Sequence, residues 1–242
     1  MSSTASSRTS SSGSLALLAS WALASCVAAP EPRLLHSDDF VNLDQWVIEA
    51  ESPDARVSVR DGILDIDTPR GVTLWFRPEL TGPVEIEFVA TAVSEGGAND
   101  QVSDLNVFWM ASNRDGSSPL STRGGRFAEY NDLRTYYVGL GGNRNTTSRF
   151  RRYIGDAEVR PLLPEHDLST PDVLLVPNTK QKITLVADRS TIEHKRDGGT
   201  LFHLEDPAPY TRGWFALRTT QSHLRIERLR VRTLSAGHPS DR

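Results

Sequence analysis

The feature that most constrains this chain is a repeated alternation of apolar and polar residues along short segments bounded by turn residues. Residues 84–90 alternate apolar side chains with glutamates, and residues 57–67 form two alternating segments joined by Asp61-Gly62. A period of two residues is typical of β-strands with one buried and one solvated face, and Asp-Gly is a common hairpin turn. From Leu34 onward we find no helical periodicity longer than two turns. The pattern therefore predicts an all-β chain.

The same alternation recurs along the rest of the chain. We predict further strands at residues 71–77, 104–110, 134–140, 149–154, 182–187, 191–195, 213–219 and 223–233. Many antiparallel strands without intervening helices indicate an all-β, two-sheet antiparallel jelly-roll sandwich. Neither a linker nor an internal repeat interrupts residues 34–234. We therefore predict a single β-sandwich domain there, followed by a flexible tail at residues 235–242.

The N-terminal residues resemble a secretory leader. Residues 1–14 are rich in Ser and Thr, and a short apolar stretch leads into a Leu-Ala-Ser-Cys sequence that ends at Cys26, the only cysteine. This sequence resembles the lipobox of bacterial lipoproteins, in which the cysteine is lipidated. We predict a lipoprotein signal peptide at residues 1–25, lipidation of Cys26, and a short tether at residues 26–33. The protein would be secreted to the bacterial periplasm or cell surface; a plain signal-peptidase site after Ala29 is the alternative.

Charge and cysteine content exclude several classes of protein. No apolar run approaches the roughly 20 residues needed to span a bilayer, and one cysteine provides neither a disulfide framework nor a cysteine-based zinc site. The chain has 31 acidic and 27 basic residues and a formal net charge of −4, which argues against nucleic acid as a partner. Residues 123–160, however, contain eight arginines and four acidic residues, a local net charge of +4. Such a positive segment in an acidic protein attracts an anionic ligand.

Alternation also assigns the two faces of each predicted strand. The side chains on the faces turned away from the core include Trp75, Asn106, Tyr137, Arg149, Arg151, Tyr153, Trp214 and Arg218. If these strands share one sheet, the residues form a groove of guanidinium groups, phenols, indoles and an amide. Indoles stack on sugar rings, and arginine binds carboxylates with two hydrogen bonds. We therefore predict binding of an acidic carbohydrate, with a merely solvated outer sheet face as the alternative.

One block of sequence resembles a known family. Residues 136–153 (YYVGLGGNRNTTSRFRRY), together with residues 103–110 and 213–219, resemble the YesU-like family of bacterial proteins. The resemblance covers nearly the whole chain after the leader, and departs from the family at Leu140 and Arg144. It implies a concanavalin-A-like sandwich of the lectin/glucanase type. It also implies a link to the use of rhamnogalacturonan and related uronic-acid glycans, whereas it leaves the reaction open.

Uronic-acid polymers are commonly cut by β-elimination, and candidate residues for this reaction are present. Arg149 and Arg151 would neutralise the substrate carboxylate, with Asn106 as a further donor. Tyr137 or Tyr153 would serve as base or acid if neighbouring guanidinium groups lower the phenol pKa. His166 lies on a long predicted loop and would shuttle protons near neutral pH, with an ordinary surface histidine as the alternative. We also count Asn143 and Asn145, in the turn after residues 134–140, as substrate-binding amides.

Other kinds of chemistry find less support. Retaining hydrolysis needs two carboxylates about 5–5.5 Å apart, but no Glu-x-Asp-x-x-Glu run occurs, and Asp104 is the only acid beside the predicted groove. The glycines at 139, 141 and 142 are not followed by a helical pattern, so a dinucleotide site is disfavoured. His223 is a weaker candidate for catalysis. We predict no cofactor and no metal-ligand motif, although a structural calcium ion held by loop carbonyls would leave no sequence signal.

Two functions follow from these observations. We favour a carbohydrate-active enzyme, of the polysaccharide lyase or dehydratase type, that acts on an acidic oligosaccharide or polysaccharide containing uronic acid or rhamnose. The alternative is a non-catalytic, lectin-like surface lipoprotein that binds the same glycans. In both cases the membrane is a partner only through the N-terminal lipid anchor.

Overall fold

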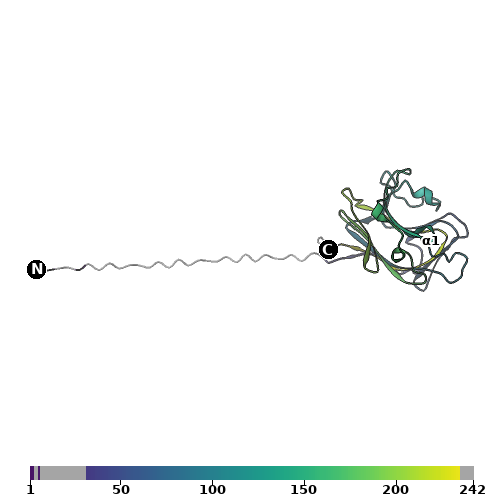
Figure 1. Ribbon diagram of the computed structural model, residues 1–242, viewed down its shortest axis with the longest axis horizontal. Helices are drawn as coiled ribbons and strands as arrows, with labels where there is room; N and C mark the ends of the chain where they lie inside the picture. Colours follow the sequence, from purple (N-terminus) through teal and green to yellow (C-terminus); the bar gives the residue numbers. More distant parts are fainter. Residues whose placement is uncertain (3–4, 6–30, 235–242) are drawn as a thin grey trace.

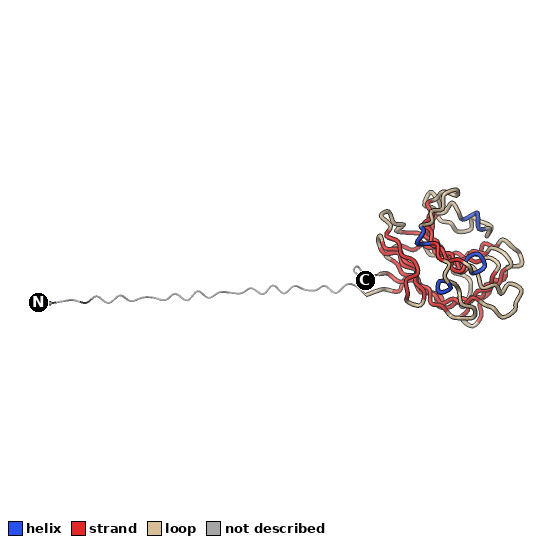
Figure 2. Tube along the Cα trace, in the orientation of Figure 1, coloured by secondary structure: helices blue, strands red, loops and turns tan. Residues whose placement is uncertain are grey.

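The computed structural model describes residues 1, 2, 5 and 31–234, and its ordered strands form two antiparallel sheets packed face to face (Figure 1). Apart from residues 1, 2, 5 and 31–33, the predicted leader and tether lie outside the described residues, as do Cys26 and the tail. The predicted all-β, two-sheet sandwich is confirmed. Figure 2 shows strands and loops with only short helical turns between them. No helix in the described part of the chain is long and apolar enough to cross a bilayer.

The first sheet, called sheet 1 below, has eight strands. Its order is β14 (Gly199–Glu205), β13 (Thr191–Arg196), β12 (Gln181–Asp188), β7 (Val84–Ala92), β16 (Ser222–Thr233), β4 (Ile63–Thr68) and β3 (Arg56–Arg60), with β1 (Leu34–Asp38) beside β16. The predicted Asp-Gly turns join β3 to β4 and β13 to β14. Sheet 1 forms the back of the sandwich relative to the site described below.

The second sheet, sheet 2, also has eight strands and carries the site. Its order is β11 (Asp167–Leu168), β10 (Thr147–Ile154), β9 (Arg134–Gly141), β8 (Leu105–Ser112), β15 (Arg212–Thr219), β5 (Val72–Phe76) and β2 (Trp46–Ala50), with β6 (Leu80–Thr81) beside β15. The short helical turns are η1 (Phe127–Tyr130), α1 (Gly142–Asn145), η2 (Pro164–His166) and η3 (Pro171–Val173). In α1, Asn143 and Arg144 have left-handed backbone angles, so α1 is a tight connection from β9 to β10 rather than a regular helix.

The core lies between the two sheets and contains the apolar faces that alternation predicted. Val107 and Trp109 from β8, and Tyr136 and Val138 from β9, are at most 1% exposed. These face assignments are confirmed. Ile154, which we placed on the same face of its strand as Phe150, is 41% exposed because β10 ends there.

A second apolar cluster covers part of the opposite face of sheet 2. Its members, Trp75, Phe108, Ala111, Tyr130, Leu133, Tyr137, Tyr153 and Ala216, pack beneath the loop that joins β8 to β9. The loop is held down at Glu49, whose carboxylate accepts hydrogen bonds from the Tyr130 hydroxyl at 2.7 Å and from Trp75 Nε1 at 3.0 Å. The outer face of sheet 2 is therefore not simply solvated. One end of it remains open.

Candidate functional site

The open end of the outer face of sheet 2 contains a cavity of about 390 Å³, beside the turn from β9 into β10. Seven of the sequence-predicted site residues line it, namely Asn106, Tyr137, Asn143, Arg149, Arg151, Tyr153 and Arg218. The structure thus brings together residues from β8, β9, β10 and β15 that are far apart in the sequence. The volume lies in the range of pockets that bind small ligands.

The strand register explains why these side chains meet. Across sheet 2, Arg149 of β10 pairs with Gly139 of β9, Gly139 pairs with Asn106 of β8, and Asn106 pairs with Arg218 of β15. Directly paired residues on neighbouring strands point to the same face of a sheet. A row of paired positions from four strands therefore crosses the floor of the cavity, with polar side chains at Arg149, Asn106 and Arg218, and we call it the floor row.

Gly139 opens space in the middle of the floor row. A Cβ atom built on this glycine would lie 2.6 Å from the Tyr137 hydroxyl oxygen and 3.2 Å from Asn106 Oδ1. Any side chain at position 139 would therefore collide with two polar groups that line the cavity. Because position 139 has no side chain, the phenol of Tyr137 lies over it, along β9 and near Asn106.

The cavity carries an excess of positive charge. Its lining contains four arginines, Arg149, Arg151, Arg160 and Arg218, and a single carboxylate, Asp104. Arg149 is paired with Asp167, at 2.7 Å from Nε to Oδ1. Within the described part of the chain, the other three guanidinium groups form no ion pair with a carboxylate. A site of this kind favours an anionic ligand.

The buried arginine of the floor row is fixed in place by neutral groups. Arg218 is 2% exposed, and its Nη1 donates to Thr73 Oγ1 at 2.7 Å and to the Gly125 carbonyl at 2.9 Å. Its guanidinium lies between the rings of Phe127 and Tyr130, at 5.1 and 4.8 Å. Burial lowers the pKa of Arg218, but an arginine stays charged at neutral pH. This charge is held without a carboxylate partner.

Two buried polar atoms on the floor row have no hydrogen-bond partner among the described residues. They are Asn106 Oδ1 and Arg218 Nε, and their side chains are 3% and 2% exposed. Leaving a buried polar group unpaired costs about 1–3 kcal/mol, so native proteins rarely do so without water or a ligand. Asn106 Oδ1 on β8 is thus an unused acceptor, which suits a hydroxyl group, and Arg218 Nε on the neighbouring β15 is an unused charged donor, which suits an anion.

The condition set for the cavity phenols, a pKa lowered by neighbouring guanidinium groups, is not met. Burial raises the pKa of Tyr137 well above its ordinary value, and it also raises the pKa of Tyr153, although the charges of Arg151 and Arg218 act in the opposite direction in both cases. Desolvation of the phenolate outweighs the attraction of the nearby cations. Both phenols are therefore protonated at neutral pH, and they are hydrogen-bond or proton donors rather than bases.

The two tryptophans predicted for the groove, and the predicted proton shuttle His166, lie elsewhere. Trp75 is completely buried in the second apolar cluster, because the β8–β9 loop covers it. Trp214 pairs with Ala111 at the opposite end of β8 and lines a separate cavity of about 300 Å³. His166 is 5% exposed and packs in the core against Phe150, with ring centroids 4.8 Å apart.

Asn145 is also directed away from the cavity. Its amide donates to the Leu175 carbonyl and accepts from the Leu175 backbone N–H, both at 2.9 Å, so it secures the following loop instead. His223 lies between Asp65 and Asp100 on the side of sheet 1 and does not line the cavity.

Sequence reasoning assigned no role to several residues that line the cavity, among them Asp104, Phe127 and Arg160. Asp104 was noted beside the groove, Arg160 was counted in the positive segment, and Phe127 was in a long loop of unassigned structure. The long loops were the available signal, since Phe127 and Arg160 both come from segments of irregular sequence between strands. In the described part of the chain no group of three His, Cys, Asp or Glu residues is placed to hold a metal ion.

The sequence matches one family model, that of the "Domain of unknown function (DUF6250)", over residues 66–229. None of the curated proteins matches the chain by sequence.

Solved structures of low sequence identity resemble the fold. A Bacillus subtilis protein of unknown function with a galectin-like fold superposes with a TM-score of 0.64 at 14% identity, covering 84% of this chain and 97% of its own. The LamA protein of Zobellia galactanivorans, solved with laminaritriose and laminaritetraose, gives 0.56 at 12% identity, covering 83% and 98%. The carbohydrate-binding module CBM66 from Bacillus subtilis gives 0.52 at 9% identity, covering 79% and 96%. At these identities the likeness concerns the fold.

Proposed function

This chain belongs to the DUF6250 family, and from the cavity on its second sheet we propose that it binds an acidic carbohydrate. One observation carries the proposal. The cavity contains both arginines without a carboxylate partner and, on the floor row, polar atoms without a hydrogen-bond partner. Arg151 and Arg218 supply positive charge without a carboxylate partner, and Asn106 Oδ1 is a free acceptor for a hydroxyl group. A uronic acid carries both a carboxylate and several hydroxyl groups on one ring.

The structural neighbours support a carbohydrate as the ligand. One is a carbohydrate-binding module, and another was solved with bound laminari-oligosaccharides. The lining of the cavity also includes aromatic rings and neutral polar groups, among them Phe127, Tyr153 and Thr147. This mixture suits a sugar ring better than a bare inorganic anion. The resemblance of residues 136–153 to the YesU-like family favours rhamnogalacturonan-type and related uronic-acid glycans as the source.

A second candidate function is lyase-type elimination on the same ligand. It is favoured because Asp104 is the only carboxylate in the lining, whereas retaining and inverting hydrolysis both need a pair. Elimination needs a neutralised substrate carboxylate and a proton donor for the leaving oxygen. Arg151 and the protonated Tyr137 supply these, whereas His166, buried in the core, does not take part.

The binding proposal is tested by titration calorimetry with short oligoglucuronides and, for comparison, neutral laminari-oligosaccharides. We expect the acidic ligand alone to bind, and Arg151→Ala to weaken binding at least about tenfold, since it removes a cation whose charge no carboxylate compensates. Arg56→Ala, an exposed arginine on β3 of sheet 1, is the matched control and should bind normally. Equal binding of acidic and neutral ligands, or an unchanged affinity in Arg151→Ala, refutes the proposal.

For the chain ends we propose export and lipid attachment at Cys26, and a single domain over residues 34–234. Mass spectrometry of the protein extracted from bacterial membranes tests the first point, because lipidation adds a defined mass to an N-terminal cysteine. Cys26→Ala should abolish both the added mass and membrane association. Recovery of a soluble chain beginning at residue 30 would instead support cleavage after Ala29.

A further inference from the structure

The cavity contains one ionisable carboxyl group, and its position suggests a chemical role. We propose that Asp104 is the proton-accepting catalytic residue of this cavity in β-elimination from a uronate, with the Tyr137 phenol as the proton donor. The inference rests on the proposed acidic-carbohydrate function and adds the group that removes the proton.

Asp104 is held in an unusual conformation directly before β8. Its φ angle of 57° lies in the left-handed region, and its backbone N–H donates to the Gly141 carbonyl at 3.0 Å. Non-glycine residues with such angles are uncommon and often found at functional sites. The conformation lets the side chain line the cavity instead of continuing the strand.

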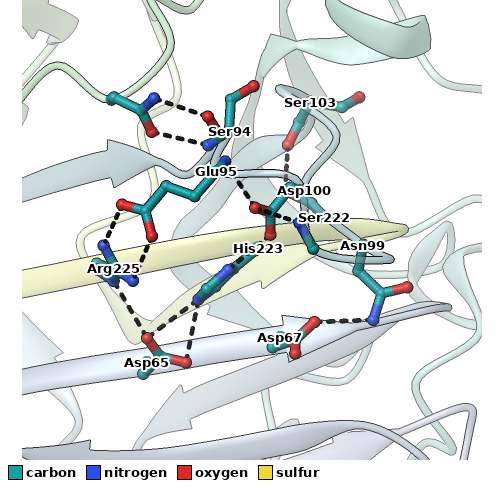
Figure 3. A network of polar contacts seen from close by, with 12 residues as sticks. Asp65, Asp67, Ser94, Glu95, Asn99, Asp100, Ser103, Ser222, His223 and Arg225 are labelled. Carbon is teal, nitrogen blue, oxygen red and sulfur yellow. Dashed lines mark hydrogen bonds and ion pairs between the residues drawn. The ribbon is translucent and has the colours of Figure 1, made fainter.

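Neighbouring hydroxyl and amide groups orient the carboxylate. Ser103 Oγ donates to Asp104 Oδ2, and Asn106 Nδ2 donates to Oδ1 at 3.3 Å. Ser103 is in turn fixed by Ser222, whose hydroxyl donates to its carbonyl at 2.9 Å (Figure 3). Within the described residues no arginine or lysine pairs with Asp104, so its negative charge is not consumed in an ion pair.

The segment before Asp104 is fastened to sheet 1 by a separate polar network. As Figure 3 shows, Asp100 accepts a contact from His223 at 2.9 Å, Glu95 pairs with Arg225, and Asn99 bonds Asp67 at 2.8 Å. These contacts come from β4 and β16 and lie outside the cavity lining. The segment between β7 and β8 is thereby attached to sheet 1 through Glu95, Asn99 and Asp100, and Asp104 follows it at the cavity.

Asp104 and Tyr137 flank the same open space. Asn106 connects them, since its Nδ2 contacts Asp104 and its unpartnered Oδ1 lies 3.2 Å from the Cβ position above Gly139. The Tyr137 hydroxyl lies 2.6 Å from that same position. A sugar ring bound in this cavity would therefore meet both a carboxylate and a phenol. Arg151 and Arg218 are available for its carboxylate.

The proposed step balances without any co-reactant. Asp104 takes the proton from C5, and the electron pair of the C5–H bond forms the C4=C5 double bond. The bond from C4 to the glycosidic oxygen breaks, and Tyr137 donates its proton to that oxygen. Asp104 then returns a proton to the Tyr137 phenolate through water, which restores both groups. The products are an unsaturated uronate and a shortened glycan.

The ionisation of the two residues agrees with these roles. Burial raises the pKa of Asp104, against the opposing effects of its hydrogen bonds to Ser103 and Asn106 and of the Arg218 charge, so its carboxylate is a stronger base than one in water. Tyr137 keeps its proton at neutral pH, as described above.

The test compares the full chain with Asp104→Asn and with Asp67→Asn as a matched control. Asn has nearly the same shape as Asp but cannot accept the proton. Asp67 contacts Asn99 of the same loop and does not line the cavity. Oligoglucuronide binding is measured by calorimetry, and product by the ultraviolet absorbance of the new double bond.

We expect Asp104→Asn to bind the ligand within about threefold of the unsubstituted protein and to lose about 10²–10⁴-fold in turnover. Asp67→Asn should retain both properties. In the unsubstituted protein the rate should rise with pH through an ionisation above that of an ordinary aspartate, and this limb should be absent from the residual rate of Asp104→Asn.

Two results overturn the inference while leaving the binding site intact. One is binding without any unsaturated product by the unsubstituted protein, and the other is turnover by Asp104→Asn within about threefold of normal. Absence of oligoglucuronide binding by the unsubstituted protein refutes the proposed function itself. The calorimetric measurement thus separates failure of the site from failure of the catalytic assignment.

Discussion

The hydroxyl of Tyr130 donates a 2.7 Å hydrogen bond to the carboxylate of Glu49, although 81 positions of sequence separate the two residues. The same carboxylate accepts the backbone N–H groups of Thr122 and Arg123 at 2.9 and 3.1 Å. Glu49 is 5% exposed, so it gathers the β8–β9 loop onto sheet 2 from a buried position. The loop so fixed carries Phe127 to the edge of the cavity.

Replacing Glu49 should therefore destabilise the protein and loosen the cavity together. We expect Glu49→Gln to lower the free energy of unfolding by about 1–3 kcal/mol, because an amide cannot accept all the hydrogen bonds that the carboxylate accepts. Urea unfolding measures the change. Glu79→Gln, which removes an exposed pair with Arg212, should change it by less than about 1 kcal/mol. Equal effects of the two substitutions would contradict the anchoring role of Glu49.

Filling the space above Gly139 should block the ligand. A Cβ at this position would come within 2.6 Å of the Tyr137 hydroxyl, so Gly139→Ala must displace the phenol or occupy part of the cavity. We expect acidic-oligosaccharide affinity to fall at least about tenfold, or about 1.4 kcal/mol. Calorimetry checks the affinity. Gly199→Ala on β14, where an added Cβ meets only ordinary contacts, is the control, and its affinity should match that of the unsubstituted protein.

Stability should depend on pH through His223. Burial alone lowers the pKa of this imidazole, but hydrogen bonds to Asp65 and Asp100 outweigh burial and raise it. A raised pKa in the folded state adds stability that is complete below the unfolded value of about 6.5 and is lost as pH rises through the folded value.

Comparison with His223→Gln isolates the contribution of His223 to the pH dependence of stability. It is needed because other histidines have lowered pKa values and therefore change stability with pH in the opposite direction. Burial lowers the pKa of His194 to about 3, so this residue costs stability as pH falls below about 6.5. We expect the difference in unfolding free energy between the unsubstituted protein and His223→Gln to shrink from about pH 6 to about pH 8. A difference that stays constant over this interval would show that His223 does not titrate between its two carboxylates.

Trp214 should have no part in binding at the main cavity. It lies at the other end of β8, in a cavity shared with Glu79, Arg134 and Tyr210. Trp214→Ala should leave acidic-oligosaccharide affinity within about twofold, whereas Arg151→Ala weakens it at least about tenfold. A loss of affinity in Trp214→Ala comparable to that in Arg151→Ala would mean that the ligand extends along the whole outer face of sheet 2.

Alternation predicted the strands well wherever one face is buried in the core. Residues 134–140 and 213–219 were found within one residue of β9 and β15, because their apolar sets point into the sandwich. Among the strands of five or more residues, β1, β2 and β14 were not predicted. Two of them lie at the ends of the sheet orders and β1 lies beside the main path of sheet 1, so these strands show weaker patterns.

The same reasoning assigned the site residues to the correct face but not to the correct surroundings. Asn106, Tyr137 and Arg149 followed from side-chain direction alone, which depends only on strand periodicity. The burial of Trp75 depends on where the β8–β9 loop folds, and the raised pKa of Tyr137 depends on that burial. Neither is encoded by local alternation, so Trp75 was wrongly placed in the groove, and the lowered pKa that would let Tyr137 act as a base is not found.

The floor row joins four strands. Each of its residues faces the cavity because alternate residues along a strand point to opposite faces of the sheet. Insertion or deletion of one amino acid within β8, β9, β10 or β15 would turn that strand's cavity-facing side chains into the core, which in β10 and β15 would bury an arginine. Diversification of the ligand must therefore proceed by exchanging side chains at a constant strand length. Changes of length are confined to the surrounding loops, where they would reshape the rim and leave the floor intact.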